Sequence, residues 1–128
     1  MEERKNVRVV VPVVDEKKMN ALLSGHFGRA PFFAVVDIGE KGEVVGLKMI
    51  PNVSEHFGGT GHPPDRILQL NPHAVITYGM GPRALGIFQN ARVAVLRTNA
   101  KTVKEVIDGY NRDELEELTE GCLHARHK

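Results

Sequence analysis

The sequence predicts a mixed α/β fold, and three observations support this. Val7–Val14 consists almost entirely of apolar β-branched residues, which is typical of a strand buried on both faces. The short connection Gly39–Gly42 joins two further apolar runs, which is typical of an antiparallel hairpin. Later apolar runs at Ala74–Tyr78 and Val93–Leu96 flank a helix-like segment, as parallel strands with a helical crossover do.

The first half of the chain predicts three antiparallel strands. The first is Val7–Val14, the second Phe32–Ile38 and the third Glu43–Pro51. Pro12 has no N–H to give to a ladder, so it marks either a bulge or the end of the first strand. The glycine-rich stretch Asn52–Gly61 shows no periodicity and is expected to be a loop.

The second half predicts two strands and several helices. The strands are Ala74–Tyr78 and Val93–Leu96. One helix is expected to open at His62–Asp65, with proline in its first turn, and another to cover Arg83–Gln89. A third is expected to begin with a capping box at Thr102–Glu105 and to continue through Tyr110. A short helix is expected near Asp113–Leu118, with Gly121 as its stop signal.

These elements predict a ribonuclease-H-like topology, a mixed five-stranded sheet of order 3-2-1-4-5 with flanking helices. We expect one domain over residues 1–128, with a core at about 7–118 and a mobile tail at 119–128.

Composition excludes several function classes. The formal net charge is +1, and the aromatic residues are not interleaved with basic ones, so no nucleic-acid partner is expected. The charged N-terminus has no apolar signal core, and no apolar run is long enough to span a bilayer. We therefore predict a cytoplasmic protein with no membrane partner. The single cysteine, Cys122, excludes an intrachain disulfide.

Three glycine-bearing loops are expected at one end of the sheet: Ser24–Arg29, His56–His62 and Gly79–Pro82. In the first, His26 can donate, accept or bind a metal, and Arg29 can pair with an anion. The alternative is a tight turn in which His26 caps a backbone group and Arg29 is solvated.

The other two loops also have alternative interpretations. In the second loop His56 and His62, which surround Gly59 and Gly61, are candidate ligands. The alternative is that the glycines only make the loop flexible and that His62 caps the following helix. Gly79 and Gly81 precede a helix, where free N–H groups favour an anion, or they form an ordinary strand-to-helix turn.

The C-terminal tail gathers a thiol and two imidazoles in Cys122, His124 and His127. Thiolate and imidazole suit iron–sulfur units, zinc or copper. One thiol cannot build an all-thiolate site, so such a site would need His26, His62, a second copy in a homodimer, or sulfide from the ligand. The alternative is a frayed terminus.

Catalysis is poorly supported. A two-metal nuclease on this topology needs clustered carboxylates, including one within the first strand. That strand has none; Asp15 follows it and Asp37 lies on the next strand. There is also no activated-serine arrangement. The sequence favours a binding protein over an enzyme.

The sequence resembles the dinitrogenase iron–molybdenum cofactor biosynthesis family. The resemblance is carried by the motifs Ser24-x-His26-Phe27-Gly28-Arg29-Ala30-Pro31-x-Phe33, Asn52 with Gly59-x-Gly61, Ala74-Val75-Ile76-x-x-Gly79-x-Gly81-Pro82 and Val103-x-x-x-Ile107-x-x-Tyr110. It covers about Val9 to Leu115.

The resemblance implies a non-catalytic carrier of an iron–sulfur or iron–molybdenum-type cluster or its precursor. It implies His26 as a ligand or outer donor and Arg29 as its charge partner. Gly28 and the glycine loops would supply amides to sulfides, and the protein partner would be a cluster donor or acceptor. The tail with Cys122 lies outside the family motifs. The alternative function is a phosphate- or nucleotide-binding regulatory module that uses the helix N-terminus at Gly79–Pro82.

Overall fold

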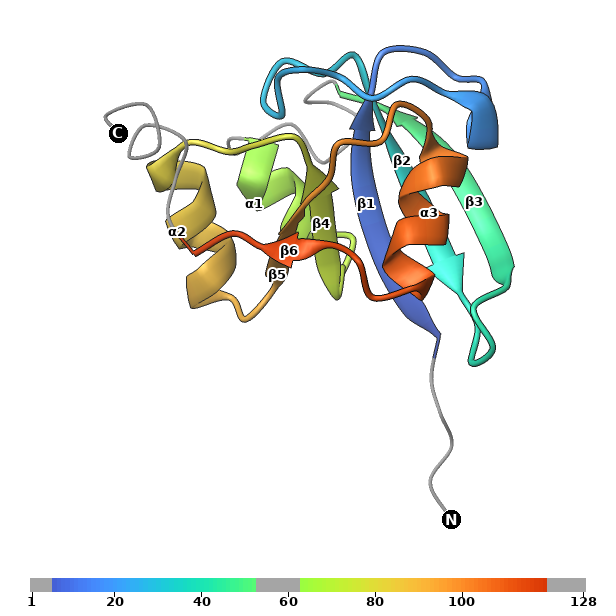
Figure 1. Cartoon of the computed structure of the whole chain (residues 1–128). Coiled ribbons are helices and arrows are strands. Elements are labelled where there is room, and N and C mark those ends of the chain that lie inside the picture. The colour runs from blue at the N-terminus through green and yellow to red at the C-terminus, as the bar shows by residue number, and fades with distance from the viewer. Residues whose placement is uncertain (1–5, 53–62, 120–128) are drawn as a thin grey trace.

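The chain forms a six-stranded mixed sheet with helices on both faces (Figure 1). The computed structural model describes residues 6–52 and 63–119. In chain order the elements are β1 (Val7–Val13), the 3₁₀ turn η1 (Lys18–Asn20), β2 (Phe32–Ile38), β3 (Val44–Pro51), α1 (Pro63–Leu68), β4 (Ala74–Thr77), α2 (Pro82–Asn90), β5 (Ala94–Arg97), α3 (Val103–Asn111) and β6 (Glu116–Glu117).

The strand order is β3-β2-β1-β4-β5-β6, which confirms the predicted order 3-2-1-4-5 and adds a sixth strand. β1 pairs antiparallel with β2, from Val7↔Ile38 to Val13↔Phe32. It pairs parallel with β4, and β4 pairs parallel with β5. The chain therefore leaves β1, β4 and β5 at the same edge of the sheet, which we call the carboxyl edge; the opposite edge is the amino edge.

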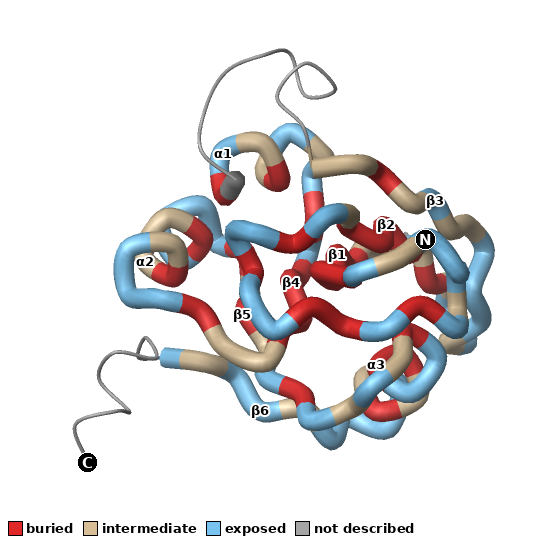
Figure 2. The backbone as a smooth tube through the Cα atoms, turned by 90° about the horizontal axis from the view of Figure 1, so that it is seen from above, coloured by how far each residue is buried: buried red, intermediate tan, exposed pale blue. Residues whose placement is uncertain are grey.

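Side-chain alternation along β1 explains why the strand is apolar on both faces. Val9, Val11 and Val13 pack on the face covered by α3, while Val10 packs on the face covered by α1 and α2. All four are fully buried. Figure 2 shows α3 on one side of the sheet and α1 and α2 on the other. The prediction of a strand buried on both faces is confirmed.

The turns and helix caps predicted from local sequence signals are also found in the structure. Thr102 and Glu105 form the predicted capping box at the start of α3. The β2–β3 hairpin turns at Gly39–Gly42, where Gly42 has a φ of 88°. Pro12 is the next-to-last residue of β1 and is paired in regular register, so it marks the strand end and not a bulge. The register shift lies instead between Asp37 and Ile38, opposite β3.

The predicted helix near Asp113–Leu118 is wrong. Leu115 and Leu118 are three residues apart, a spacing that in a helix keeps both on one face. In the structure Leu115 packs on the α3 face of the sheet and Leu118 on the opposite face. An extended chain does this, because side chains an odd number of residues apart point in opposite directions. The segment accordingly forms β6, which pairs antiparallel with β5. The stop signal proposed at Gly121 lies outside the described residues.

No helix in the described part of the chain is long and apolar enough to cross a membrane.

One glycine in α2 provides a direct test of the fold. A Cβ added at Gly86 would meet no atom within 4 Å. We expect Gly86→Ala to raise the free energy of unfolding by about 0.5–1 kcal/mol, because alanine has the higher helix propensity and restricts the unfolded chain. Urea unfolding followed by circular dichroism measures the change.

The matched control is Gly109→Ala in α3, where the added Cβ would lie 3.3 Å from Cδ2 of Leu115. Crowding there should cancel much of the propensity gain. An equal gain at both positions would contradict the packing described for α3.

Candidate functional site

The loops that follow β1 and β4 meet at the carboxyl edge, at the top of Figure 1. Residues 14–31, which include η1, connect β1 to β2, and residues 78–81 connect β4 to α2. Asn52 follows the end of β3 at the same edge, because β3 ends opposite the start of β2. The first and third loops predicted at one end of the sheet are therefore brought to the same edge.

The segment before His26 is held as an extra extended stretch across this edge. The N–H of Ser24 donates to the carbonyl of Pro12 at 2.9 Å, and that of Leu23 donates to the carbonyl of Lys101 at 3.0 Å. Isolated bridges pair Val13 with Leu23 and Leu22 with Thr102. The loop thus rests on β1 and on the chain that leaves β5, which gives it a rigid base.

Ser24 sets the turn that presents His26. Its hydroxyl accepts from the N–H of His26 at 3.2 Å and donates to the carbonyl of the same residue at 3.0 Å. The Ser24 side chain is buried, whereas His26 is exposed. The backbone capping that the alternative interpretation assigned to His26 is therefore performed by Ser24.

Phe27 anchors the middle of the loop in the core. It is 6% exposed, and its ring centroid lies 5.6 Å from that of Phe33 and 5.7 Å from that of Phe88. Ala30 is buried in the same cluster. Because Phe27 and Ala30 point inward, the residues between and beside them, including Gly28 and Arg29, lie at the surface.

Asn52 ties the far end of the loop to helix α1. Its Nδ2 donates to the carbonyls of Ala30 at 2.9 Å and Gly28 at 3.2 Å, and its Oδ1 accepts from Nη2 of Arg66 at 2.8 Å. Its backbone N–H also donates to the carbonyl of Pro31. The sequence analysis named Asn52 only as part of a family motif and did not identify Arg66. The positioning role of the two residues was missed, since nothing local shows which carbonyls an Asn will bind.

The second loop of the site begins where β4 ends. The hydroxyl of Thr77 donates to the carbonyl of Gly79 at 3.3 Å, and Met80 is buried against the cluster that holds Phe27. Gly81 is the N-cap of α2 and Pro82 its first residue, so no side chain of the cap residue covers the first turn. The predicted helix start is confirmed.

A hollow of about 330 Å³ lies beside Gly81. It is bounded by the first turns of α1 and α2 and is lined by Pro64, Gly81, Arg83, Ala84 and Ile87. The lining is almost entirely apolar, and Arg83 is an exposed residue. This edge therefore offers room for an apolar part of a guest beside Gly81 and Arg83.

Within the described part of the chain, neither packing nor backbone conformation requires glycine at Gly25 and Gly81, which both lie at the carboxyl edge. A Cβ at Gly25 or at Gly81 would meet nothing within 4 Å, and neither residue has a positive φ. Gly81 has a φ of −67°, which any residue adopts. Glycine at such positions leaves the backbone amides open to the close approach of a ligand.

The polar side chains of the first loop, His26 and Arg29, are also available to a ligand. Within residues 6–52 and 63–119, neither the imidazole of His26 nor the guanidinium of Arg29 has a hydrogen-bond partner. Both residues are exposed. An imidazole and a guanidinium beside accessible amides form a surface that favours an anion able to accept hydrogen bonds or coordinate nitrogen.

Tyr78 joins the two parallel-strand loops. Its hydroxyl donates to the carbonyl of Ala100 at 2.8 Å. Burial, and secondarily the nearby carboxylate of Glu105, raise the pKa of Tyr78. The phenol therefore stays protonated as a donor at neutral pH, which keeps the loops after β4 and β5 connected.

Several predicted site residues lie outside the described part of the chain: Gly59, Gly61, His62, Cys122, His124 and His127. Among the residues that are described, no group of three or more His, Cys, Asp or Glu side chains could hold a metal ion. The described edge therefore contributes one imidazole, His26, and a set of cations and amides.

The two carboxylates considered for a nuclease are separated by the structure. Asp37 lies opposite Arg8 near the start of β1 and receives hydrogen bonds from Nε at 2.8 Å and Nη2 at 3.1 Å. Asp15 follows the other end of β1 and accepts from the N–H of Lys17. The pair cannot form one two-metal centre, which agrees with the rejection of that activity.

Comparisons with known proteins agree with this architecture. The sequence matches the family model described as dinitrogenase iron-molybdenum cofactor over residues 8–113. It is 27% identical over 117 residues to the uncharacterized protein MJ0580 of Methanocaldococcus jannaschii, covering 89% of this chain and 93% of that protein.

Solved structures share the fold. The crystal structure of PH0822 is 28% identical, with a TM-score of 0.72 over 88% of this chain and 96% of that one. The apo form of the orange protein from Desulfovibrio gigas is 17% identical, with a TM-score of 0.74 over 92% and 98% of the two chains. At that identity the second likeness concerns the fold alone.

Proposed function

We propose, from the premise that the chain belongs to the dinitrogenase iron-molybdenum cofactor family, that it is a non-catalytic carrier of an anionic metal–sulfur cluster or its precursor. The cargo would be of the iron–sulfur or iron–molybdenum type and would bind at the carboxyl edge. The protein partners would be those that supply or receive such a cluster. The orange protein, a fold neighbour, is described in an apo form, that is, without its bound group.

One observation carries the proposal. Gly25 and Gly81 leave backbone amides uncovered at positions where neither φ nor packing requires glycine, beside the unpartnered side chains of His26 and Arg29. An anionic cluster presents sulfides that accept from amides and guanidinium groups, and metal atoms that bind imidazole. His26 would be the ligand or outer donor and Arg29 the charge partner. Gly28 and Gly79 would supply further backbone amides to the sulfides.

The donor set fits a cluster that brings its own sulfide better than a bare metal ion. The described edge offers one nitrogen ligand, whereas a bare soft metal needs several ligands. Cys122, His124, His127 and His62, with Gly59 and Gly61, are proposed to complete the binding site. A homodimer would double the number of thiols.

The test is anaerobic reconstitution with iron and sulfide, followed by desalting, metal analysis and visible spectra. We expect retained iron with sulfide-to-iron charge-transfer bands, and retention lowered about 10- to 100-fold by His26→Ala. Cys122→Ser should also weaken retention. The matched control is His73→Gln, because His73 is an exposed imidazole at the amino edge that accepts from the N–H of Arg8 at 2.9 Å.

Two results would count against the carrier proposal. One is wild-type protein that elutes without iron. The other is equal retention by wild type, His26→Ala and Cys122→Ser, which would show adventitious binding.

Phosphate binding at the start of α2 is the second candidate function. It is favoured by the glycine cap at Gly81 and the exposed Arg83 in the first turn of α2. A ligand that binds only the native state raises its stability. Inorganic phosphate should then raise the melting temperature, and Arg83→Gln should reduce that rise; no shift would exclude this function.

A further inference from the structure

A second pocket lies at the amino edge, away from the proposed cluster site. It has a volume of about 540 Å³. β1 separates the two edges by seven residues, or roughly 20 Å at about 3.3 Å per residue. Pockets of roughly 300–1,000 Å³ are typical of small-molecule sites. The proposed cluster site therefore does not account for it.

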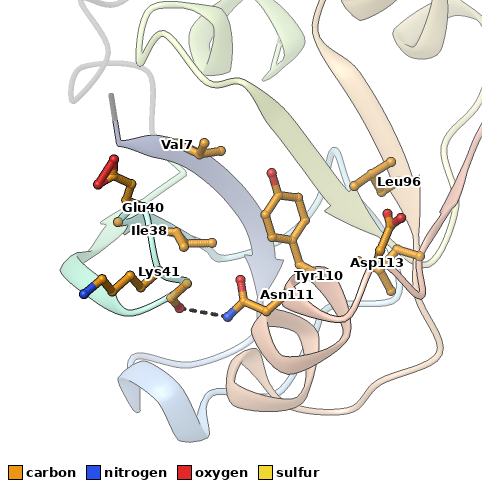
Figure 3. Close-up of a pocket in the computed structure, with 11 residues that line it drawn as sticks. Val7, Ile38, Glu40, Lys41, Leu96, Tyr110, Asn111 and Asp113 are labelled. Carbon is orange, nitrogen blue, oxygen red and sulfur yellow. Dashed lines mark hydrogen bonds between the residues drawn. The ribbon is translucent and has the colours of Figure 1, made fainter. Parts of the chain in front are cut away.

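The pocket has an apolar floor on the α3 face of the sheet. The floor is formed by Val7 of β1, Ile38 of β2, Leu96 of β5 and Leu115, all in the core cluster covered by α3. Figure 3 shows the ring of Tyr110 standing between Val7 and Leu96. The floor and this ring suit the apolar body of a small organic molecule.

The rim of the pocket is polar. It includes the hydroxyl of Tyr110, the amide of Asn111 and the carboxylate of Asp113, which lies beside Leu96 in Figure 3. Glu40 and Lys41 also belong to the rim, but their charged ends point away from Tyr110 in the same view. The charge directed at the floor is therefore that of Asp113, which favours a cation.

The backbone holds Asp113 in place. Its N–H donates to the carbonyl of Tyr110 and that of Glu114 donates to the carbonyl of Gly109, both at 3.0 Å. These two bonds form the motif that ends a helix with a left-handed residue, and Asp113 has a φ of 58°. Glycine is the usual residue at this position, so an aspartate places a carboxylate here at some conformational cost.

The hairpin side of the pocket is fixed as well. Nδ2 of Asn111 donates to the carbonyl of Gly42 at 2.8 Å and ties the β2–β3 turn to the end of α3 (Figure 3). A side chain at Gly42 would meet that amide at 3.0 Å. The pocket thus has its wall in place before any ligand arrives, which lowers the cost of binding.

We propose that this pocket binds a small organic ammonium compound with an apolar body. The ammonium group pairs with the carboxylate of Asp113 and the face or hydroxyl of Tyr110, and the body lies on Val7 and Leu96. This site goes beyond the proposed cluster binding and shares no residue with it.

The test is a titration of the metal-free full chain with phenethylamine, followed by amide NMR spectra. Phenylacetate, which has a similar body and the opposite charge, is the control ligand. We expect saturable shifts at residues 39–42, 96 and 110–115 with phenethylamine only. Asp113→Asn should lower the affinity about fivefold or more. Asparagine tolerates the left-handed conformation, so this variant should keep the fold.

Glu40→Gln is the matched control, since it removes a rim carboxylate that points away from the floor; its affinity should equal that of wild type. Shifts that do not saturate, equal binding of phenylacetate, or unchanged affinity in Asp113→Asn would overturn the proposal. Because the titration uses no iron, a negative result does not affect the cluster proposal. In the same way, failure of the iron reconstitution does not affect the proposal for this pocket.

Discussion

Replacing Phe27 with alanine is expected to lower the free energy of unfolding by about 3–5 kcal/mol. The side chain is 6% exposed and contacts the rings of Phe33 and Phe88, so its removal leaves a cavity between the loop and α2. The edge-to-face contact with Phe88, at an interplanar angle of 87°, is lost as well. Urea unfolding followed by circular dichroism measures the change.

Phe27→Leu is the control for this prediction. It keeps most of the buried volume and should cost less than about 1.5 kcal/mol. If Phe27→Ala cost less than leucine does, the loop would not be anchored in the core as described. The reconstitution assay on the leucine variant then shows whether cluster retention depends on the aromatic contact or only on a folded loop.

Replacing Asn52 with alanine is expected to cost about 2 kcal/mol. The change leaves the carbonyls of Gly28 and Ala30 without their donor and removes the acceptor of Arg66 Nη2. Partly buried polar groups that lose a partner cost about 1–3 kcal/mol. The loop that carries His26 also loses its tie to α1, so we expect weaker cluster retention as well as a lower urea midpoint.

Asn111→Ala is the matched control for Asn52→Ala. It also breaks a side-chain hydrogen bond to a glycine carbonyl, at Gly42, but it does so at the amino edge. It should cost about 1 kcal/mol or less and leave cluster retention unchanged. Equal losses of retention in the two variants would mean that the effect comes from general instability and not from loop position.

Much of the fold could be predicted because its signals are local. The β-branched run at Val7–Val13, the glycine turn at Gly39–Gly42 and the capping box at Thr102 each specify an element through nearby atoms. The segment at Asp113–Leu118 could not be predicted in this way. Leu115 and Leu118 have helical spacing, and only the two faces of the finished sheet separate them.

The candidate site, like the fold, combines features that have local sequence signals with features that have none. The motif around His26 and the glycines before α2 indicate a binding edge only through the resemblance to the family, because on their own they also fit a tight turn and an ordinary strand-to-helix turn. Nothing local indicates that Ser24 and not His26 caps the turn, or that Asn52 reaches back 22 and 24 residues to two carbonyls. Hydrogen bonds across such distances depend on where the strands end.

By itself the sequence determined the class of fold, the family and the loop that carries the available imidazole, because side-chain periodicity and short motifs act over a few residues. The tertiary structure alone decided which polar groups are already used, since pairing depends on neighbours distant in the chain. It showed that Asp37 is held by Arg8 and that the turn of Ser24 leaves His26 exposed. The tertiary structure also forms a pocket around Tyr110 at the amino edge, because α3 and the β2–β3 hairpin leave part of the sheet uncovered there.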